Sequence, residues 1–237
     1  MMGPMKIHLN DTKEDIKNAV DFLTEYVASN KKRDLRESEI NFIVFCLKQI
    51  VFLKLIRDCK FPEIKNENLK STISDFFHII VSLINNEVRY VYLNERSLIE
   101  NYVRLILKGA YRNVNRNTFN VLKEKKYMFD FDNSDYSVIK NEYVTSCQYI
   151  HGDKIVEVTL TENLRNTISK ENKEIKFDSF FRRFIKMINI FSILLLSEYY
   201  ECIQYCFMRK SWTLEYLQGK KYMEKKFQLD NIKKKDS

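Results

Sequence analysis

Turn-forming residues are scarce in this chain, and their scarcity limits the folds open to it. Only 4 glycines and 2 prolines occur among 237 residues, against 17 phenylalanines and 14 tyrosines. A β-sandwich, or a sheet with helical crossovers, needs many tight turns, which Gly and Pro usually form. The sequence therefore predicts an all-α fold, a single helical bundle with long central helices. The segment "IVEVTLT" (155–161) alternates like a strand, so one short β-strand or hairpin is also expected.

The stretch from Ser38 to Cys59 gives the strongest helix signal. Apolar side chains cover every face of it, which predicts a helix buried on all sides. It has to end by Phe61 because Pro62 follows. A second long apolar helix is predicted from Asp178 to about Arg209. These two helices form the centre of the predicted bundle.

Helical periodicity predicts the remaining helices, and an excess of lysines sets the C-terminal residues apart from the rest of the chain. The further helices are expected from Asp11 onward, from Asn68 to Ile84, from Glu87 to Lys108, from Thr118 to Lys126, and from Asp135 to Gly152. Without repeats or a Pro/Gly/Ser linker, residues 5–210 are expected to form one domain and 211–237 a basic C-terminal tail. Seven lysines and three acids between Gly219 and Ser237 leave a net +4, half of the formal +8. The lysine run at its end is expected to be solvated, with transient phosphate contact as the alternative.

The cysteine content and the hydropathy of the sequence predict the cellular compartment of the protein. The five cysteines are an odd number without disulfide-framework spacing, which predicts a reducing compartment. The opening "MMGPMKIH" lacks the pattern of a signal peptide. The longest apolar run, Ile190 to Leu196, is far shorter than the ~20 residues that span a bilayer. A cytoplasmic protein without membrane contact is therefore expected.

Arg96, Glu100 and Arg104 form the first candidate functional group. Their i, i+4, i+8 spacing stacks them along one helix face, inside an otherwise apolar surface. One interpretation is a surface ion-pair ladder. The other is a polar row that faces a cleft or a second subunit.

His151 is the second candidate, in the stretch "EYVTSCQYIHG" (142–152). It is one of only three histidines and directly precedes Gly152, where a helix is expected to end. A histidine there can interact favourably with the helix dipole and the free carbonyls. It can also act as a catalytic group or bind a ligand. Ser146 precedes it by five residues, near the same face.

The stretch "RSLIENYVRLIL" (96–107) and the stretch "EYVTSCQYIHG" together resemble a known family. They are similar to the HEPN-like helical proteins of bacterial abortive-infection and other defence systems. The resemblance implies a bundle that often dimerises, with active members that cleave RNA without metal through an Arg and a His separated by four to six residues on one helix. No Arg stands at that distance before His151, so either Arg96 or Arg104 substitutes for it or the cleavage activity is absent.

Two functions follow from this resemblance and from the residues. The first is a HEPN-like defence protein acting on RNA, as a metal-independent endoribonuclease or a catalytically silent relative. In that case a neutral imidazole can accept the 2′-OH proton and a guanidinium can stabilise the developing charge. The candidate catalytic set is His151, Arg104, Arg96, Glu100 and Ser146, with His151 and Arg104 expected to act together. The second function is a non-enzymatic helical adaptor. Expected partners are RNA, a partner protein or a second copy of the chain, with no small-molecule cofactor.

A zinc site is the remaining alternative. Cys147 and His151 are spaced i, i+4, and so are Cys202 and Cys206. Together they can close a tetrahedral site if their helices meet. However, cysteine on an apolar helix is usually a small hydrophobic residue, so no metal is expected.

Overall fold

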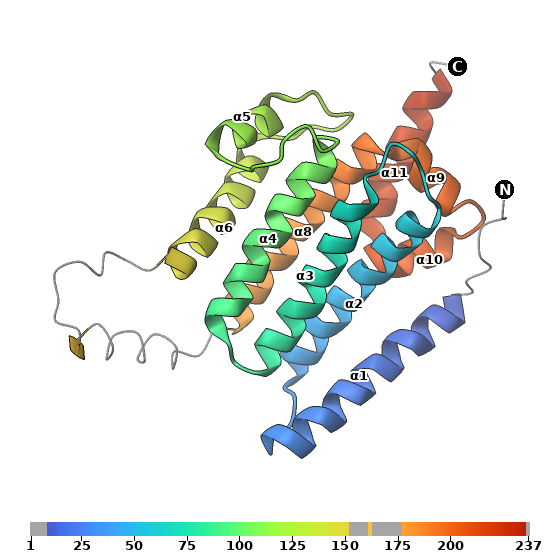
Figure 1. Ribbon diagram of the computed structural model, residues 1–237. Coiled ribbons are helices and arrows are strands. Elements are labelled where there is room, and N and C mark those ends of the chain that lie inside the picture. Colours follow the sequence, from blue (N-terminus) through green and yellow to red (C-terminus); the bar gives the residue numbers. More distant parts are fainter. Residues whose placement is uncertain (1–8, 152–160, 163–176, 236–237) are drawn as a thin grey trace.

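The computed structural model describes residues 9–151, 161–162 and 177–235 (Figure 1). The all-α prediction is confirmed, because every regular element in these ranges is a helix. The helices are α1 (Leu9–Lys31), α2 (Glu37–Asp58), α3 (Asn66–Ile84), α4 (Val88–Ile106), α5 (Arg116–Glu124), α6 (Asn133–His151), α8 (Phe177–Glu198), α9 (Tyr200–Cys206), α10 (Ser211–Gln218) and α11 (Lys220–Lys235). The strand predicted over 155–161 lies, except for Thr161, outside the described residues. None of the described helices is long and apolar enough to cross a bilayer.

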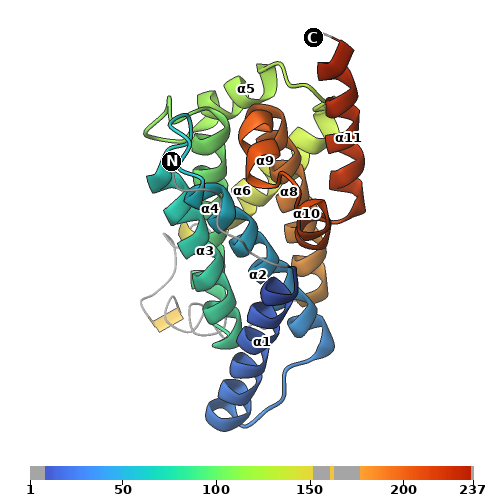
Figure 2. The same ribbon diagram turned by 90° about the vertical axis from the view of Figure 1, so that its right-hand side faces the viewer.

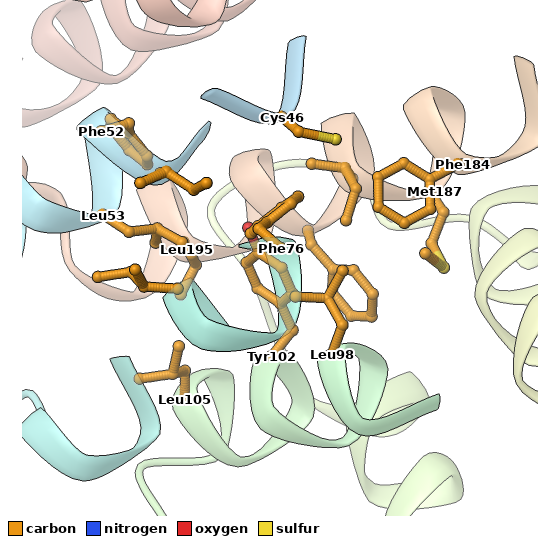
Figure 3. Close-up of a cluster of buried hydrophobic side chains, with 14 of the residues drawn as sticks. Cys46, Phe52, Leu53, Phe76, Leu98, Tyr102, Leu105, Phe184, Met187 and Leu195 are labelled. Atoms are coloured by element: carbon orange, nitrogen blue, oxygen red, sulfur yellow. The ribbon is translucent and has the colours of Figure 1, made fainter. Parts of the chain in front are cut away.

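Helix α2 is the central buried helix that the sequence predicts. Between Phe42 and Ile56 only Lys54 is exposed, because α1, α3, α8, α9 and α10 all contact this helix (Figure 2). On the other side of the core, the Tyr102 ring of α4 stacks on Phe191 of α8 with centroids 4.8 Å apart. Figure 3 shows this core, in which aromatic and aliphatic side chains from several helices interdigitate. Its close packing fixes α4, the helix that carries most candidate functional residues.

The last long helix differs from the prediction, because it breaks at Tyr199. Helix α8 ends at Glu198 and α9 begins at Tyr200, with Tyr199 in a non-helical conformation (φ −123°, ψ 36°). The buried Tyr199 hydroxyl donates a hydrogen bond of 2.7 Å to the carbonyl of Leu105, in the last turn of α4. The same carbonyl also accepts the backbone N–H of Lys108 at 3.0 Å, so the tyrosine hydroxyl uses its second lone pair and ties α4 to the break between α8 and α9. The prediction of one unbroken helix to Arg209 is therefore wrong at this residue.

Residues 211–235 also differ from the predicted basic tail. They form α10 and α11, and their side chains Leu214, Leu217, Tyr222 and Leu229 are buried in the common core. Gln218 of α10 donates to the Gln49 side chain of α2 at 3.1 Å. The sequence prediction relied on the seven lysines and did not take account of the apolar residues before and between them, which recur at helical intervals. Residue 210 is therefore not a boundary of the folded unit.

Helices α3, α4 and α6 form an antiparallel layer that positions the candidate site. A short turn over residues 85–87 joins α3 to α4, so the two lie side by side (Figure 1). Helix α6 runs antiparallel to α4, since Ile150 contacts Arg89 near the start of α4 while Tyr143 contacts Glu100 farther along it. Helix α8 covers the inner face of α4 and α6. Polar residues of α4 thus lie on both sides of the helix, toward α3 and toward α6.

Candidate functional site

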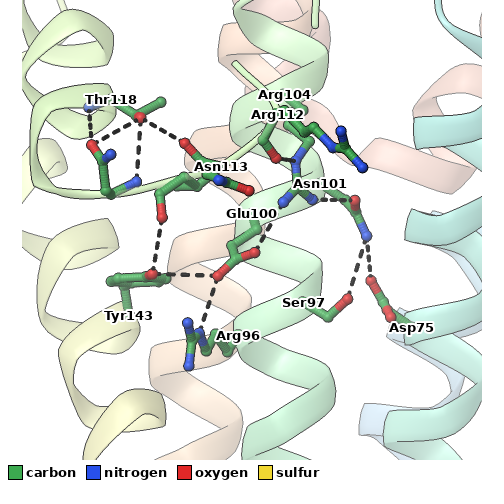
Figure 4. A network of polar contacts seen from close by, with 12 residues as sticks. Asp75, Arg96, Ser97, Glu100, Asn101, Arg104, Arg112, Asn113, Thr118 and Tyr143 are labelled. Atoms are coloured by element: carbon green, nitrogen blue, oxygen red, sulfur yellow. Dashed lines mark hydrogen bonds and ion pairs between the residues drawn. The ribbon is translucent and has the colours of Figure 1, made fainter.

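Arg96, Glu100 and Arg104 stack along α4 as their spacing predicts. The Glu100 carboxylate accepts from Arg96 Nε at 3.0 Å and from Arg104 Nη2 at 3.1 Å (Figure 4). The side chains are partly buried, with 17 to 28% exposed. One carboxylate thus lies between two guanidinium groups, and it leaves one net positive charge on this face.

Further hydrogen bonds extend this row into a network, which we call the α4 network. Arg104 Nη1 donates to the Asn101 side chain at 2.9 Å, and its Nε donates to the Arg112 carbonyl at 3.2 Å. Asn101 in turn donates to Asp75 of α3 at 2.8 Å (Figure 4). The Arg104 guanidinium therefore binds protein acceptors in three directions and links the end of α4 to the loop that follows it.

Tyr143 connects the α4 network to α6. Its hydroxyl lies 3.3 Å from Glu100 Oε1, and the Arg96 guanidinium lies over its ring, 5.7 Å from the centroid. Burial raises the pKa of Tyr143 to about 12, and the negative charge of Glu100 adds to this shift. Tyr143 therefore stays a neutral hydrogen-bond donor at any physiological pH.

Asp75 is a member of the network that the sequence analysis missed. Its side chain is buried, and burial raises its pKa to about 6, although hydrogen bonds from Asn101 and Ser97 oppose the shift. The charge of His78, one turn later on α3, also acts to lower this pKa. The i, i+3 spacing of Asp75 and His78 places both side chains on one helix face, and this spacing is the signal in the sequence that could have identified Asp75.

Ser146 does not join the α4 network, although it was predicted alongside Arg96 and Arg104. Its hydroxyl lies 2.7 Å from Glu95 Oε2 and 2.8 Å from the Glu142 carbonyl. The Glu142 carboxylate accepts from Arg183 Nε of α8 at 3.0 Å. We call Glu95, Glu142, Ser146 and Arg183 the buried acid cluster. It lies between α4, α6 and α8.

Glu95 is fully buried, and its burial favours the protonated form of the carboxyl at neutral pH. Burial raises its pKa to about 8, the nearby Glu142 adds to the shift, and the Ser146 hydrogen bond opposes it. Hydrogen-bond counting leads to the same protonation state. The Ser146 hydroxyl carries one proton and has two acceptors beside it. When Glu95 is protonated it donates to Ser146 Oγ, which donates to the Glu142 carbonyl, and both bonds are made.

The sequence contained a signal for Glu95 that was not used. Glu95 lies between Val91 and Leu98 at helical spacing, on the stripe of α4 that faces the core. A carboxyl on a buried stripe needs a partner or a proton, and so marks a special position. Its partners Ser146 and Arg183 lie far away along the chain, so spacing alone could not have identified them.

His151 is the last residue of α6, and its side chain lies outside what the structure describes. The preceding residue, Ile150, offers its carbonyl to Arg89 Nη2 at 3.2 Å, at the start of α4. Arg104 is fifteen residues farther along α4, or about 22 Å at a rise of 1.5 Å per residue. Arg96 is nearer to this end of α6, because Cys147, one turn before His151, is close enough to Arg96 to interact with it electrostatically.

The four zinc ligands considered from the sequence are divided between two regions. Cys147 lies near Arg96 on the α4–α6 side, while Cys202 and Cys206 of α9 lie near Cys59 at the end of α2. Across the described ranges, no group of three or more His, Cys, Asp or Glu side chains has the arrangement of a metal site.

The end of the bundle beyond the α4 network carries positively charged side chains in a stretch of sequence without acids. From Asn101 to Lys123 there is no acid, but there are five cations: Arg104, Lys108, Arg112, Arg116 and Lys123. Lys108 is paired with Glu198 at 2.9 Å, whereas Arg112 and Arg116 are exposed and form no salt bridge with any described residue. We call the segment from Arg104 to Arg116 the basic end.

Comparison of the chain with protein-family models, curated proteins and solved structures finds no match.

Proposed function

We propose that the chain is a HEPN-like helical protein of bacterial defence that binds RNA through its basic end. The observation that carries the proposal is the run from Asn101 to Lys123, which contains five cations and no acid. Arg112 and Arg116 are exposed there, beside the polar side chains Asn113 and Asn117. Cations supply most of the affinity of a protein for a nucleic-acid backbone, and neighbouring polar groups add hydrogen bonds to phosphate and sugar.

The contact between the two resembling stretches supports the family assignment in this proposal. They meet along the α4–α6 interface, where Tyr143 bonds Glu100 and Ser146 bonds Glu95. Tyr143, Ser146 and Glu100 are motif positions, and Glu95 directly precedes the first stretch, so these contacts give a physical reason for the motif. The motif residues hold two helices together.

The same contacts favour binding without cleavage. Arg96 and Arg104 share the Glu100 carboxylate, and Arg104 also donates to Asn101 and to the Arg112 carbonyl. A guanidinium engaged in this way stabilises structure and would need to be released to stabilise a phosphorane. Of the two candidate catalytic arginines, Arg96 lies closer than Arg104 to the end of α6 that carries His151.

The test is RNA binding by two charge-matched double variants. Fluorescence anisotropy with a labelled single-stranded RNA and with tRNA should show Arg112→Glu/Arg116→Glu weakened on the order of 10-fold or more at moderate salt. The control is Lys17→Glu/Lys31→Glu on α1, which Figure 1 shows far from α5 and which changes the charge equally. Arg116 is the first residue of α5, where an acid suits the helix dipole, so the variant should fold. Equal weakening in both variants would show a non-specific charge effect and refute the proposal.

Incubation with total RNA, with and without EDTA, tests cleavage separately. We expect no cleavage by wild type. EDTA-resistant cleavage that is lost in both Arg96→Ala and His151→Ala would instead establish the metal-free nuclease activity. Cleavage that EDTA abolishes would point to a metal.

The adaptor function is the second candidate, and one surface favours it. A hollow of about 520 Å³ lies at the turn between α3 and α4 and is lined in part by Arg89, Tyr90, Leu93 and Ile150. Tyr90 and Leu93 are 56% and 42% exposed there. Apolar side chains beside a hollow are typical of protein-binding surfaces. Tyr90→Ser/Leu93→Ser should lower the self-association of the chain in sedimentation if a second copy binds there, and an unchanged monomer mass would remove that candidate.

A further inference from the structure

Three cysteines come together where α2 ends. Cys59 is the C-cap residue of α2, and Cys202 and Cys206 lie one turn apart on α9. Cys206 and Cys202 both lie close enough to Cys59 for its side chain to add to the effect of burial on their pKa, and Cys206 is the nearer of the two, within hydrogen-bonding reach of the Cys59 thiol. The sequence pattern contained the Cys202–Cys206 spacing, but the nearest partner comes from more than 140 residues away along the chain.

Aromatic packing on both sides holds this contact in place. Phe61, two residues after Cys59, meets the Tyr205 ring edge to face at 5.5 Å. Phe52 stacks on Phe207, the residue after Cys206, at 5.7 Å. Both ring pairs join the same two chain segments as the sulfur contact. The two sulfurs are therefore held together by side chains that do not depend on them.

The three thiols differ in their access to solvent. Cys59 is half-buried, whereas Cys202 and Cys206 are buried. Burial raises the pKa of Cys202 to about 11 and raises that of Cys206 still more. A buried thiol of this kind reacts poorly with a dissolved oxidant, because the thiolate is the reactive form. Cys59 is thus the thiol that an oxidant reaches first.

We propose that Cys59 and Cys206 form a reversible intramolecular disulfide when the protein reacts with hydrogen peroxide. The Cys59 thiolate attacks one peroxide oxygen, the O–O bond breaks, and the departing oxygen takes up a proton and leaves as water. This leaves Cys59 as a sulfenic acid. The Cys206 sulfur then attacks the Cys59 sulfur, the S–S bond forms and the S–O bond breaks. The hydroxyl leaves as a second water with the Cys206 proton. Two thiols lose two electrons in total, and one peroxide is reduced to two waters.

Proximity makes Cys206 the resolving thiol despite its burial. The second step needs no access from solvent, since the sulfenic acid is already held against the Cys206 sulfur. Cys202 is the competing thiol, one turn earlier on the same helix. The direct contact with Cys59 belongs to Cys206, so the disulfide joins these two residues. The inference does not depend on the proposed RNA binding.

Mass spectrometry of the full-length protein can test this directly. The protein is treated with hydrogen peroxide, free thiols are blocked with N-ethylmaleimide, and the product is digested with trypsin without reduction. Trypsin leaves Cys59 in the short peptide Asp58–Lys60, while Cys202 and Cys206 remain together in one peptide from Met187 to Arg209. The expected product is a link between these two peptides that dithiothreitol removes.

Three variants assign the bond. The link should be lost in Cys59→Ser, retained in Cys202→Ser, and retained in Cys147→Ser, a half-buried cysteine on α6 that serves as the matched control. Cys59→Ser changes a partly exposed helix end, so circular dichroism should show it folded. A link that is lost in Cys202→Ser assigns the wrong partner and overturns the proposal. So does a Cys59 that is over-oxidised or alkylated with no link, or a link that appears only in dimers on a non-reducing gel.

Discussion

The α4 network and the buried acid cluster lie on two sides of the same helix, yet they balance charge in opposite ways. In the α4 network one carboxylate, Glu100, is shared by two arginines, and water reaches all three side chains. In the buried acid cluster two carboxyls, Glu95 and Glu142, lie near one arginine, Arg183. The first arrangement has one more cation than it has acids. The second is neutral only if one carboxyl holds a proton, and the fully buried Glu95 is the one that does.

The difference teaches that position relative to solvent, and not residue type, decides what a glutamate does here. Glu95 and Glu100 are five residues apart on α4 and carry the same side chain. Burial raises the pKa of Glu95 to about 8, whereas Glu100 accepts hydrogen bonds as a carboxylate from two cations. Substitutions in the two regions should therefore change the stability of the protein by different amounts.

The largest effect should come from Glu95→Gln, and it should depend on pH. The pKa of Glu95 is raised in the folded protein, so its contribution to the free energy of unfolding is present at low pH and falls as pH rises between the ordinary value of 4.5 and about 8. Glutamine mimics the protonated acid at every pH. The variant should be more stable than wild type by less than about 1 kcal/mol near pH 5 and on the order of 3 to 5 kcal/mol near pH 8. Urea unfolding at both pH values measures this, and parallel pH profiles would refute it.

Arg183→Met should follow, with the opposite sign. Among the described residues it removes the one cation that lies near the two buried carboxyls, and breaking such a pair typically costs about 3 to 5 kcal/mol. Because the Arg183 side chain is 40% exposed, the cost here should be nearer about 2 to 3 kcal/mol. The loss should be smaller at pH 5, where Glu95 is protonated and does not need the charge of Arg183. Denaturant melts of this variant at pH 5 and pH 8 test the prediction, and Lys54→Met on α2, an exposed cation, serves as the control.

Glu100→Gln should cost only about 1 kcal/mol, since its ion pairs are partly exposed. It should also lower the pKa of Tyr143, because the charge of Glu100 contributes to the raised value of about 12. Ultraviolet titration of the tyrosines can detect this change. A free-energy loss as large as that of Arg183→Met would contradict the distinction between the two regions.

Arg96→Ala should have the smallest effect on stability, about 0.5 kcal/mol, in thermal or urea unfolding. Arg104 still pairs with Glu100 in this variant, so the carboxylate keeps one cation. The matched comparison is Arg104→Ala, which also removes the bonds to Asn101 and to the Arg112 carbonyl and should cost more. Equal costs for the two variants would mean that these extra bonds contribute nothing.

The sequence predicted features that depend on neighbouring residues and missed those that depend on tertiary register. The spacing of Arg96, Glu100 and Arg104 was sufficient to predict two ion pairs along one helix. The bond from Asn101 to Asp75 joins residues 26 positions apart, and that from Ser146 to Glu95 joins residues 51 apart. Such contacts depend on the axial register between two packed helices. No single helix contains that information.

The same limit explains the two places where the observed fold differs from the predicted one. Apolar periodicity continues through Tyr199, so nothing local indicates that the helix breaks there to bring a hydroxyl to the Leu105 carbonyl. Beyond residue 210, lysines outnumber the buried apolar residues, and the segment therefore looked like a tail. In both places tertiary contacts decide the outcome over local preference.

The break at Tyr199 also has a consequence for the order of folding. Its hydroxyl reaches back across 94 residues to the last turn of α4, so this bond can form only after α4 exists. The backbone conformation at this break sets the direction in which the chain continues into α9, α10 and α11. The C-terminal helices should therefore dock last and open first, and their amides should exchange hydrogen faster than those of α2, α4 and α8. Tyr199→Phe, which removes only the hydroxyl, should accelerate exchange in α9 to α11 and leave the α3–α4 pair unchanged.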